Sequence, residues 1–189
     1  MTSTTVNASR SFTGINFLIG IVGIAALIAA ANYKVPIAPV PLSLQTFIVL
    51  GLAITLPWRI AASVVASYVM LAFVIGQPVA AGEVPVTGGY LLGFIAMAAL
   101  MSWVHPILKR IPSPSNRMFA YTCLAITAHV IVYAFGLARL HFAMASLNEG
   151  WTLEQTFTAG ALPFLTGDLM KCVLFGALAA SVTAFKRRR

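Results

Sequence analysis

Six long apolar runs, separated by shorter segments that contain charged residues, prolines or glycines, dominate this chain. They extend over residues 15–31, 44–58, 60–75, 89–104, 118–137 and 168–185. A membrane-spanning helix needs about 20 predominantly apolar residues, so the shorter runs must borrow flanking residues. The pattern predicts an all-α bundle of six transmembrane helices that forms a single domain over residues 1–189, with a polar lead at residues 1–14 and a basic tail at residues 186–189.

The second and third runs are separated only by the cluster Pro57-Trp58-Arg59. Taken together they are too long for one crossing of the bilayer. Proline interrupts a helix, while tryptophan and arginine favour the membrane–water interface. The cluster therefore predicts a tight interfacial turn between two crossings.

Composition places the chain in the membrane independently of its pattern. With 60% hydrophobic residues, 8% charged residues and a mean hydropathy of +0.93, it cannot build a soluble domain with a polar surface. The net charge of +8 comes from the connections and ends, and no basic soluble domain is present to bind nucleic acid. Cleavage of the first run as a signal peptide, which Ala29-Ala30-Ala31 imitates, is a minor alternative because the run exceeds the usual ~7–15 apolar residues.

The basic residues predict the orientation of the bundle. On the six-span count, Lys34 and Arg139 are the only basic residues on one side of the membrane. The other side carries Arg10, Arg59, Lys109, Arg110, Arg117, Lys186, Arg187, Arg188 and Arg189. By the positive-inside rule, both termini are cytoplasmic. Asp168 then lies at the outer end of the last span, and a site built around it opens outward.

Asp168 and Lys171 place a carboxylate and an ammonium inside the last apolar segment. Ionisable groups within a membrane span are costly and usually mark a functional site. A separation of three residues puts the two side chains on one face of a helix, where they can pair or together hold a polar ligand. The alternative is a self-neutralised pair that only orients the helix.

Three connections contain prolines or glycines or are long and polar: residues 32–43, 76–88 and 138–167. All three fall on the outer side, which is typical of a binding protein that faces outward. Catalytic apparatus is not visible: the chain has no P-loop motif, and His105, His129 and His141 are not spaced as a metal site. We expect no enzymatic activity, cofactor or metal, and we interpret His129 as a hydrogen-bonded packing residue.

Four separated segments resemble the successive signatures of the BioY family, the biotin-binding S components of energy-coupling factor (ECF) vitamin transporters. They are residues 36–46 (PIAPVPLSLQT), 87–94 (TGGYLLGF), 129–136 (HVIVYAFG) and 163–171 (PFLTGDLMK). The resemblance runs in order over nearly the whole chain. One departure is the approach to Thr87, where Gly82-Glu83-Val84-Pro85-Val86 replaces a longer glycine-rich segment, so the outer loop is expected to close over a ligand differently.

This resemblance implies biotin as the transported substrate and a location in the bacterial plasma membrane. Asp168 can accept from the ureido N–H groups of biotin, and Lys171 can donate to its ureido carbonyl or its carboxylate. Further expected substrate-binding residues are Gln45, Thr87, Gly88, Gly89 and Tyr90, with Tyr90 stacking on the ring while its hydroxyl stays hydrated. The alternatives are an interfacial polar role for Gln45 and a tight turn into a helix for the two glycines.

The first run contains two pairs of small residues at helical spacing, Ala25 with Ala29 and Ala26 with Ala30. Such pairs let another helix approach closely. The resemblance implies docking of this face on a transmembrane coupling subunit that two ATPases drive, whereas the spacing alone fits packing within the bundle equally well. Membrane lipid is an expected partner of the bundle, and the sequence leaves open whether the chain forms a homo-oligomer.

Two further functions remain open from the residues alone. One is a self-sufficient carrier for another small organic anion, with Asp168 as its proton-coupling group. The other, a membrane enzyme, has less support because no catalytic residues are visible.

Overall fold

The computed structural model describes residues 14–33, 43–75, 86–146 and 150–187, and in these ranges the chain is all-helical. The described residues form seven helices: α1 (Gly14–Asn32), α2 (Gln45–Thr55), α3 (Trp58–Ile75), α4 (Gly88–Leu108), α5 (Pro114–Ser146), α6 (Leu153–Gly160) and α7 (Leu162–Arg187).

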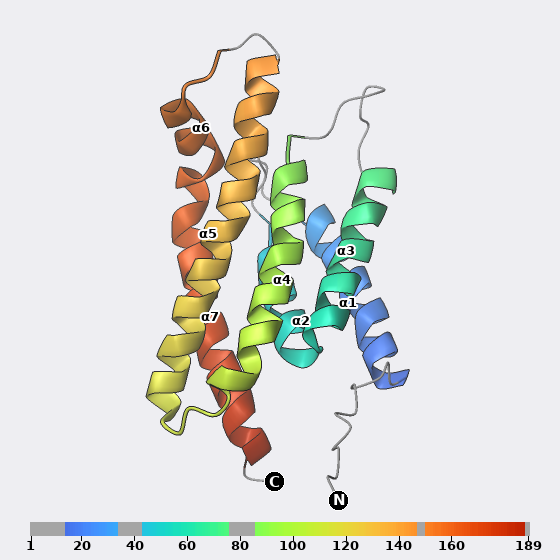
Figure 1. Ribbon diagram of the computed structural model, residues 1–189, viewed down its shortest axis with the longest axis vertical. Coiled ribbons are helices and arrows are strands. Elements are labelled where there is room, and N and C mark those ends of the chain that lie inside the picture. Colours follow the sequence, from blue (N-terminus) through green and yellow to red (C-terminus); the bar gives the residue numbers. More distant parts are fainter. Residues whose placement is uncertain (1–13, 34–42, 76–85, 147–149, 188–189) are drawn as a thin grey trace, which may run out of the picture.

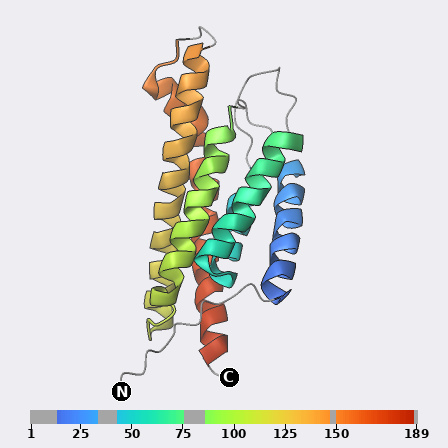
Figure 2. The same cartoon turned by 45° about the vertical axis from the view of Figure 1, so that its right-hand side comes forward.

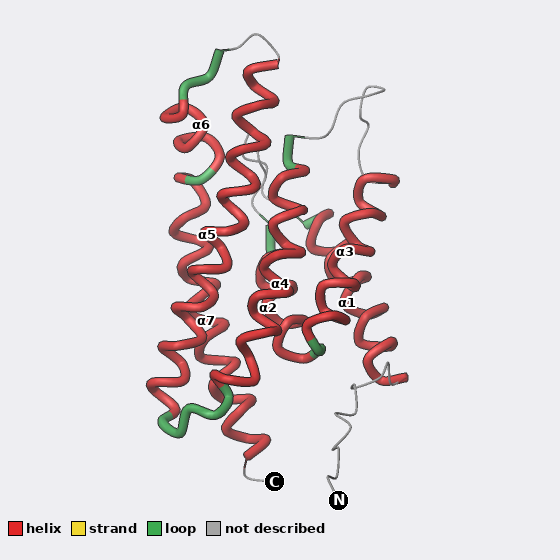
Figure 3. Tube along the Cα trace, in the orientation of Figure 1, coloured by secondary structure: helices red, strands yellow, loops and turns green. Residues whose placement is uncertain are grey.

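The helices run alternately up and down a single bundle (Figure 1). In that view α1, α3 and α5 run upward and α2, α4 and α7 run downward, while α6 lies at the upper end between α5 and α7. The view in Figure 2 shows the same order, and the tube in Figure 3 shows how short the loops at the lower end are. Helix α4 packs against α2, α3 and α5, so it forms the centre of the bundle.

Four helices are long and apolar enough to cross a membrane, namely α1, α4, α5 and residues 162–185 of α7. The apolar helices α2 and α3 are shorter, and α2 has only 11 residues. At 1.5 Å per residue, α2 is about 16 Å long, roughly half of the hydrocarbon thickness. Its lower end is the turn predicted at Pro57: α2 ends at Thr55, Leu56 is extended, and α3 begins at Trp58. The Arg59 guanidinium lies 5.2 Å from the centre of the Trp58 ring.

The segment 138–167, expected to be one long connection, is mostly helical. Helix α5 continues to Ser146 because Leu140, Ala143 and Met144 repeat at helical spacing and are buried. A capping box then starts α6: the Thr152 hydroxyl accepts from the Gln155 backbone, and the Gln155 side chain accepts from the Thr152 backbone. Polar residues interrupt the apolar pattern in this segment, so the pattern does not reveal the last part of α5 or the short helix α6.

Glycines let α4 and α5 approach closely. A Cβ atom added at Gly89 would lie 2.3 Å from the Phe135 carbonyl oxygen, and one at Gly93 would lie 2.7 Å from the Val132 Cα. Both positions face backbone, which cannot move aside as a flexible side chain can. Small residues at such crossings allow the backbone contact that packs helices in membranes.

Arg117 is buried rather than exposed in the connection where the charge pattern placed it. It lies in the first turn of α5 and is 1% exposed. Its Nη1 donates to the Ile111 carbonyl (3.0 Å) and its Nη2 donates to the Ala180 carbonyl (3.2 Å). The guanidinium therefore ties the α4–α5 connection to α7 at the lower end of the bundle.

Candidate functional site

The pair predicted from the sequence, Asp168 and Lys171, forms an ion pair on α7. Lys171 Nζ lies 2.8 Å from Asp168 Oδ1, and each side chain is 12% exposed. The same ammonium donates to the Ser43 carbonyl oxygen at 2.8 Å, just before α2 begins. Lys171 thus joins the upper half of α7 to the start of α2, in a position with little competing water.

The other oxygen of the carboxylate is held by α5. Tyr133 donates its hydroxyl hydrogen to Asp168 Oδ2 across 2.5 Å. Hydrogen bonds from charged or phenolic donors to a carboxylate are short and strong. Asp168 is thus fixed from two sides, by Lys171 at Oδ1 and by Tyr133 at Oδ2.

His129 lies one helical turn before Tyr133 on the same face of α5. Its Nδ1 is 2.9 Å from the Ala125 carbonyl oxygen and 3.4 Å from Cys172 Sγ. Its Nε2 is 3.9 Å from Asp168 Oδ1 and has no hydrogen-bond partner among the described residues. The interpretation of His129 as a buried, hydrogen-bonded residue is correct, but it omitted the neighbouring carboxylate.

Gln45 joins the site through Ser43. The Ser43 hydroxyl donates to Gln45 Oε1 (2.9 Å), and Gln45 Nε2 donates to the Tyr68 hydroxyl on α3. Gln45 is 9% exposed, so its side chain is buried within the bundle. Through Ser43 and Lys171, this amide belongs to the same polar network as Asp168.

The segment Thr87–Tyr90 forms the start of α4, and its structure favours a packing role. Gly88 and Gly89 are buried, and Gly89 faces the backbone of α5. The Tyr90 hydroxyl donates to the Gly160 carbonyl oxygen (2.9 Å), and the residue is 8% exposed, so the expectation of a hydrated hydroxyl is wrong. Among the described residues, the hydrogen bonds of the ion pair go to Tyr133 and Ser43 rather than to this segment. Its contact with a ligand stays a prediction.

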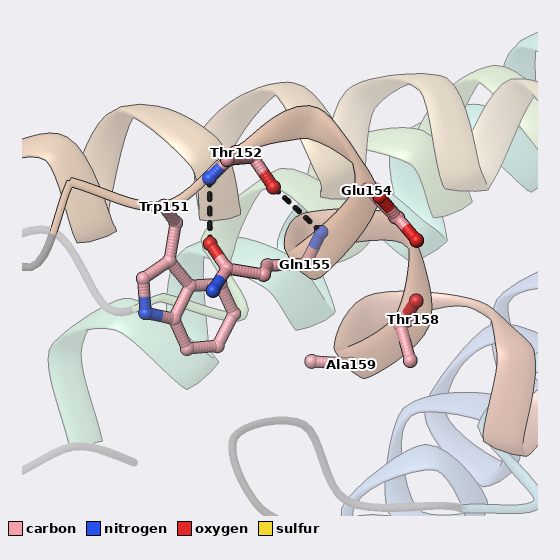
Figure 4. A pocket seen from close by; sticks show the side chains of 6 residues that line it. All are labelled: Trp151, Thr152, Glu154, Gln155, Thr158 and Ala159. Atoms are coloured by element: carbon pink, nitrogen blue, oxygen red, sulfur yellow. Dashed lines mark hydrogen bonds between the residues drawn. The ribbon is translucent and has the colours of Figure 1, made fainter.

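A hollow beside α6, which the sequence did not indicate, has a volume of about 740 Å³. Figure 4 shows the residues that line it: Trp151, Thr152, Glu154, Gln155, Thr158 and Ala159. Since α6 leads directly into α7, the hollow lies at the same end of the bundle as Asp168. An indole, hydroxyls and a carboxylate give this open hollow a mixed polar and apolar surface.

The small residues of α1 divide between two faces. Ala25 and Ala29 are exposed, Ala26 is half-buried, and Ala30 is 8% exposed and packs inside the bundle. Gly20 and Gly23 also face inward, toward Val64 and Leu52 respectively. Of the two predicted pairs, Ala25 and Ala29 are therefore the more exposed among the described residues, and docking on either pair stays a prediction.

Comparisons with known proteins extend over nearly the whole chain. The protein-family model described as "BioY family" matches residues 4–188 of this chain. A protein named biotin transporter BioY from Thermotoga maritima is 29% identical over 163 residues, covering 82% of this chain and 88% of that protein. Another of the same name, from Rhodobacter capsulatus, is 32% identical over 180 residues, covering 86% of this chain and 90% of that protein. These relatives are named as transporters and not as enzymes.

The fold also matches a solved structure. A crystal structure of the S-component for biotin from an ECF-type ABC transporter superposes with a TM-score of 0.69 at 17% sequence identity. The match covers 95% of this chain and 96% of that one, and at this identity it shows the fold alone. Together with four helices of spanning length, the transporter relatives indicate a multi-pass membrane protein. This chain belongs to the BioY family.

Proposed function

We propose that this chain is the biotin-binding membrane subunit of a vitamin uptake system. It captures biotin from the outer side of the membrane and delivers it to the cytoplasm, with energy from an ATP-driven coupling module. One observation carries the proposal: a carboxylate and an ammonium, both nearly buried and bonded to each other, lie in a membrane helix of a chain whose relatives are named biotin transporters.

The chemistry of biotin complements this polar network. Its ureido ring has two N–H donors and a carbonyl acceptor, and its valerate chain ends in a carboxylate. Asp168 accepts from the N–H groups, and Lys171 donates to the carbonyl or to the carboxylate. Gln45 is linked to Lys171 by two hydrogen bonds through Ser43, and its side chain offers a further donor and acceptor. The low polarity of the surroundings strengthens each of these interactions.

The proposed topology has six crossings with both termini in the cytoplasm of a bacterial cell. Support comes from the alternating directions of α1, α2, α3, α4, α5 and α7, since six alternating crossings return the chain to its starting side (Figure 1). The basic residues near the lower end, among them Arg59, Lys109 and Arg110, support a cytoplasmic location for that end. The Asp168 site then opens outward.

The proposed partners are a transmembrane coupling subunit and two ATPase subunits. The exposed pair Ala25 and Ala29 offers a coupling subunit a narrow face on α1. Large exposed apolar residues surround it, including Leu18, Ile21, Val22 and Ile28, and they suit either lipid or a second apolar helix.

Titration calorimetry of the detergent-purified protein tests the substrate. We expect submicromolar binding of biotin and at least about a hundredfold weaker binding of an analogue whose urea carbonyl is removed, since buried polar groups of the site then lose their partner. Dethiobiotin, which keeps the ureido ring, serves as the matched control. It should bind much more tightly than the analogue that lacks the urea carbonyl. Absence of biotin binding by a folded protein would contradict the proposal.

Uptake measurements separate this function from that of a proton-coupled carrier. In cells that also contain the coupling module, collapse of the proton gradient with ATP kept intact should leave biotin uptake unchanged. ATP depletion with the gradient intact should abolish it. The opposite result would favour the self-sufficient carrier.

A further inference from the structure

The imidazole of His129 presents an unused nitrogen to the site carboxylate. His129 is 4% exposed, and its Nε2 lies 3.9 Å from Asp168 Oδ1 with no hydrogen-bond partner in the part of the chain that the structure describes. Buried polar atoms are nearly always satisfied, so an exception beside a functional carboxylate requires an explanation. The chemistry proposed for biotin uses Asp168 and Lys171 and leaves this nitrogen without a role.

The neighbours of the ring determine which nitrogen carries the proton. A backbone carbonyl oxygen can only accept, so the 2.9 Å contact between Nδ1 and the Ala125 oxygen is a hydrogen bond only in the tautomer that carries its hydrogen on Nδ1, where Cys172 Sγ, 3.4 Å from Nδ1, can also accept. In a neutral imidazole Nε2 is then an acceptor, and it faces another acceptor, Asp168 Oδ1. Only when Nε2 also carries a proton can the ring donate a hydrogen bond to Asp168 Oδ1 and attract the carboxylate.

The net charge of the site determines when protonation of His129 Nε2 is favourable. Among the described residues, the charged and titratable groups around the imidazole are Asp168, Lys171 and Cys172 on α7 and Tyr133 on α5. Without ligand, the charges of Asp168 and Lys171 cancel, and an imidazolium would leave a net positive charge in a buried site. A bound carboxylate adds a negative charge and engages Lys171. One proton on Nε2 restores neutrality and gives Asp168 a replacement for the ammonium.

We propose that His129 is a positioning residue that acts through Asp168, taking up a proton when an anionic ligand binds. The inference rests on the proposed function, because it requires a ligand with a carboxylate near Lys171. A shift of about 1 Å brings Nε2 within hydrogen-bond distance of Oδ1. The imidazolium then holds the carboxylate in place while Lys171 turns to the ligand.

Calorimetry in buffers of different ionisation enthalpy measures the number of protons exchanged on binding. At pH 7.5 biotin is already ionised, so a proton taken up on binding is bound by the protein and is released by the buffer. We expect the wild-type protein to bind a measurable number of protons per biotin, up to about one. Biotin alcohol, which keeps the ureido ring but lacks the carboxylate, should bind with no uptake. Equal uptake with both ligands would overturn the proposal, as would no uptake with biotin.

Two substitutions place an amide at either ring nitrogen. His129→Asn keeps a donor for the Ala125 carbonyl and removes the group at Nε2, so the biotin-linked proton uptake should disappear. His129→Gln places an uncharged N–H near Asp168 and should also abolish uptake while retaining more of the affinity than Asn does. If the Asn variant binds biotin with wild-type proton uptake, another group titrates and the proposal is wrong.

The same data distinguish the two levels of inference. If the wild-type protein does not bind biotin, the proposed function fails. If biotin binds tightly but without proton uptake, the function stands and the role of His129 fails. Where neither variant folds, the comparison of biotin with biotin alcohol on the wild-type protein still decides.

Discussion

The hydroxyl of Tyr133 donates to Asp168 Oδ2 across 2.5 Å and so joins the middle of α5 to the second turn of α7. Because Lys171 occupies the other oxygen, the carboxylate has a defined orientation before any ligand arrives. A ligand that meets a preformed acceptor loses less affinity to ordering of the site. Tyr133 should therefore contribute to affinity whether or not it touches the ligand.

Tyr133→Phe should weaken biotin binding by about tenfold or more, since a hydrogen bond to a charged group contributes about 1.5–3 kcal/mol. Titration calorimetry measures the change. Tyr121→Phe is the matched control: it removes another buried tyrosine hydroxyl, which contacts His105 Nδ1 at 2.8 Å far from Asp168. An equal loss of affinity in both variants would mean that general destabilisation, not the carboxylate contact, is responsible.

Asp168→Asn and Lys171→Met should each lower biotin affinity by tenfold or more, because each removes one charged hydrogen-bonding group. Lys171→Met should also destabilise the protein, since it leaves a nearly buried carboxylate without its cation. The double variant should then be more stable than Lys171→Met alone in thermal unfolding. Wild-type affinity in both single variants would reduce the pair to a structural role and contradict the site assignment.

The sequence was sufficient for the ion pair because both partners lie on one helix, three residues apart. His129 and Tyr133 lie in the segment 129–136 that resembles a family signature, but they approach Asp168 from α5, and no local pattern reveals which face of α5 turns toward α7. Their spacing of four residues, matched by that of Asp168 and Cys172, was a usable signal: two helices with polar residues at i and i+4 can present facing polar stripes.

Apolar runs predicted the existence of the main helices but not their ends. Helix α5 extends beyond the expected span because polar residues such as Arg139 and His141 lie within a helix whose other face is still buried. The sequence allows either a turn or a ligand contact at Gly89, and the structure shows that this glycine packs closely against α5. Such a contact depends on tertiary geometry, which a single sequence does not contain.

Gly93→Val should prevent stable folding, because its branched side chain would overlap the α5 backbone at Val132. The expected result is a large loss of monodisperse protein after detergent extraction. Gly51→Val is the matched control, since a Cβ at Gly51 on α2 meets no atom of the described residues within 4 Å. Equal recovery of the two variants would show that α4 and α5 do not need this close contact.

Ala29→Trp should leave biotin affinity within about twofold of wild type and lower both the recovery of a coupling subunit and ATP-dependent uptake. The reason is that Ala29 faces outward on α1, where a bulky side chain blocks close approach of another helix. Ala30→Trp, one residue along but 8% exposed, should instead reduce the yield of folded protein. Normal uptake by the Ala29 variant would mean that this face contacts only lipid.

Cysteine labelling in intact cells tests the proposed orientation. Ser146 ends α5 at the upper end of the bundle beside α6, whereas Ser113 precedes α5 at the lower end. A cysteine at Ser146 should react with a membrane-impermeant thiol reagent, and one at Ser113 should react only after the cells are opened. The background is a Cys123→Ser variant, because Cys123 is exposed on the bundle surface while Cys172 is buried. The reverse labelling pattern would place the Asp168 end in the cytoplasm, where a subunit that captures an external vitamin has no access to it.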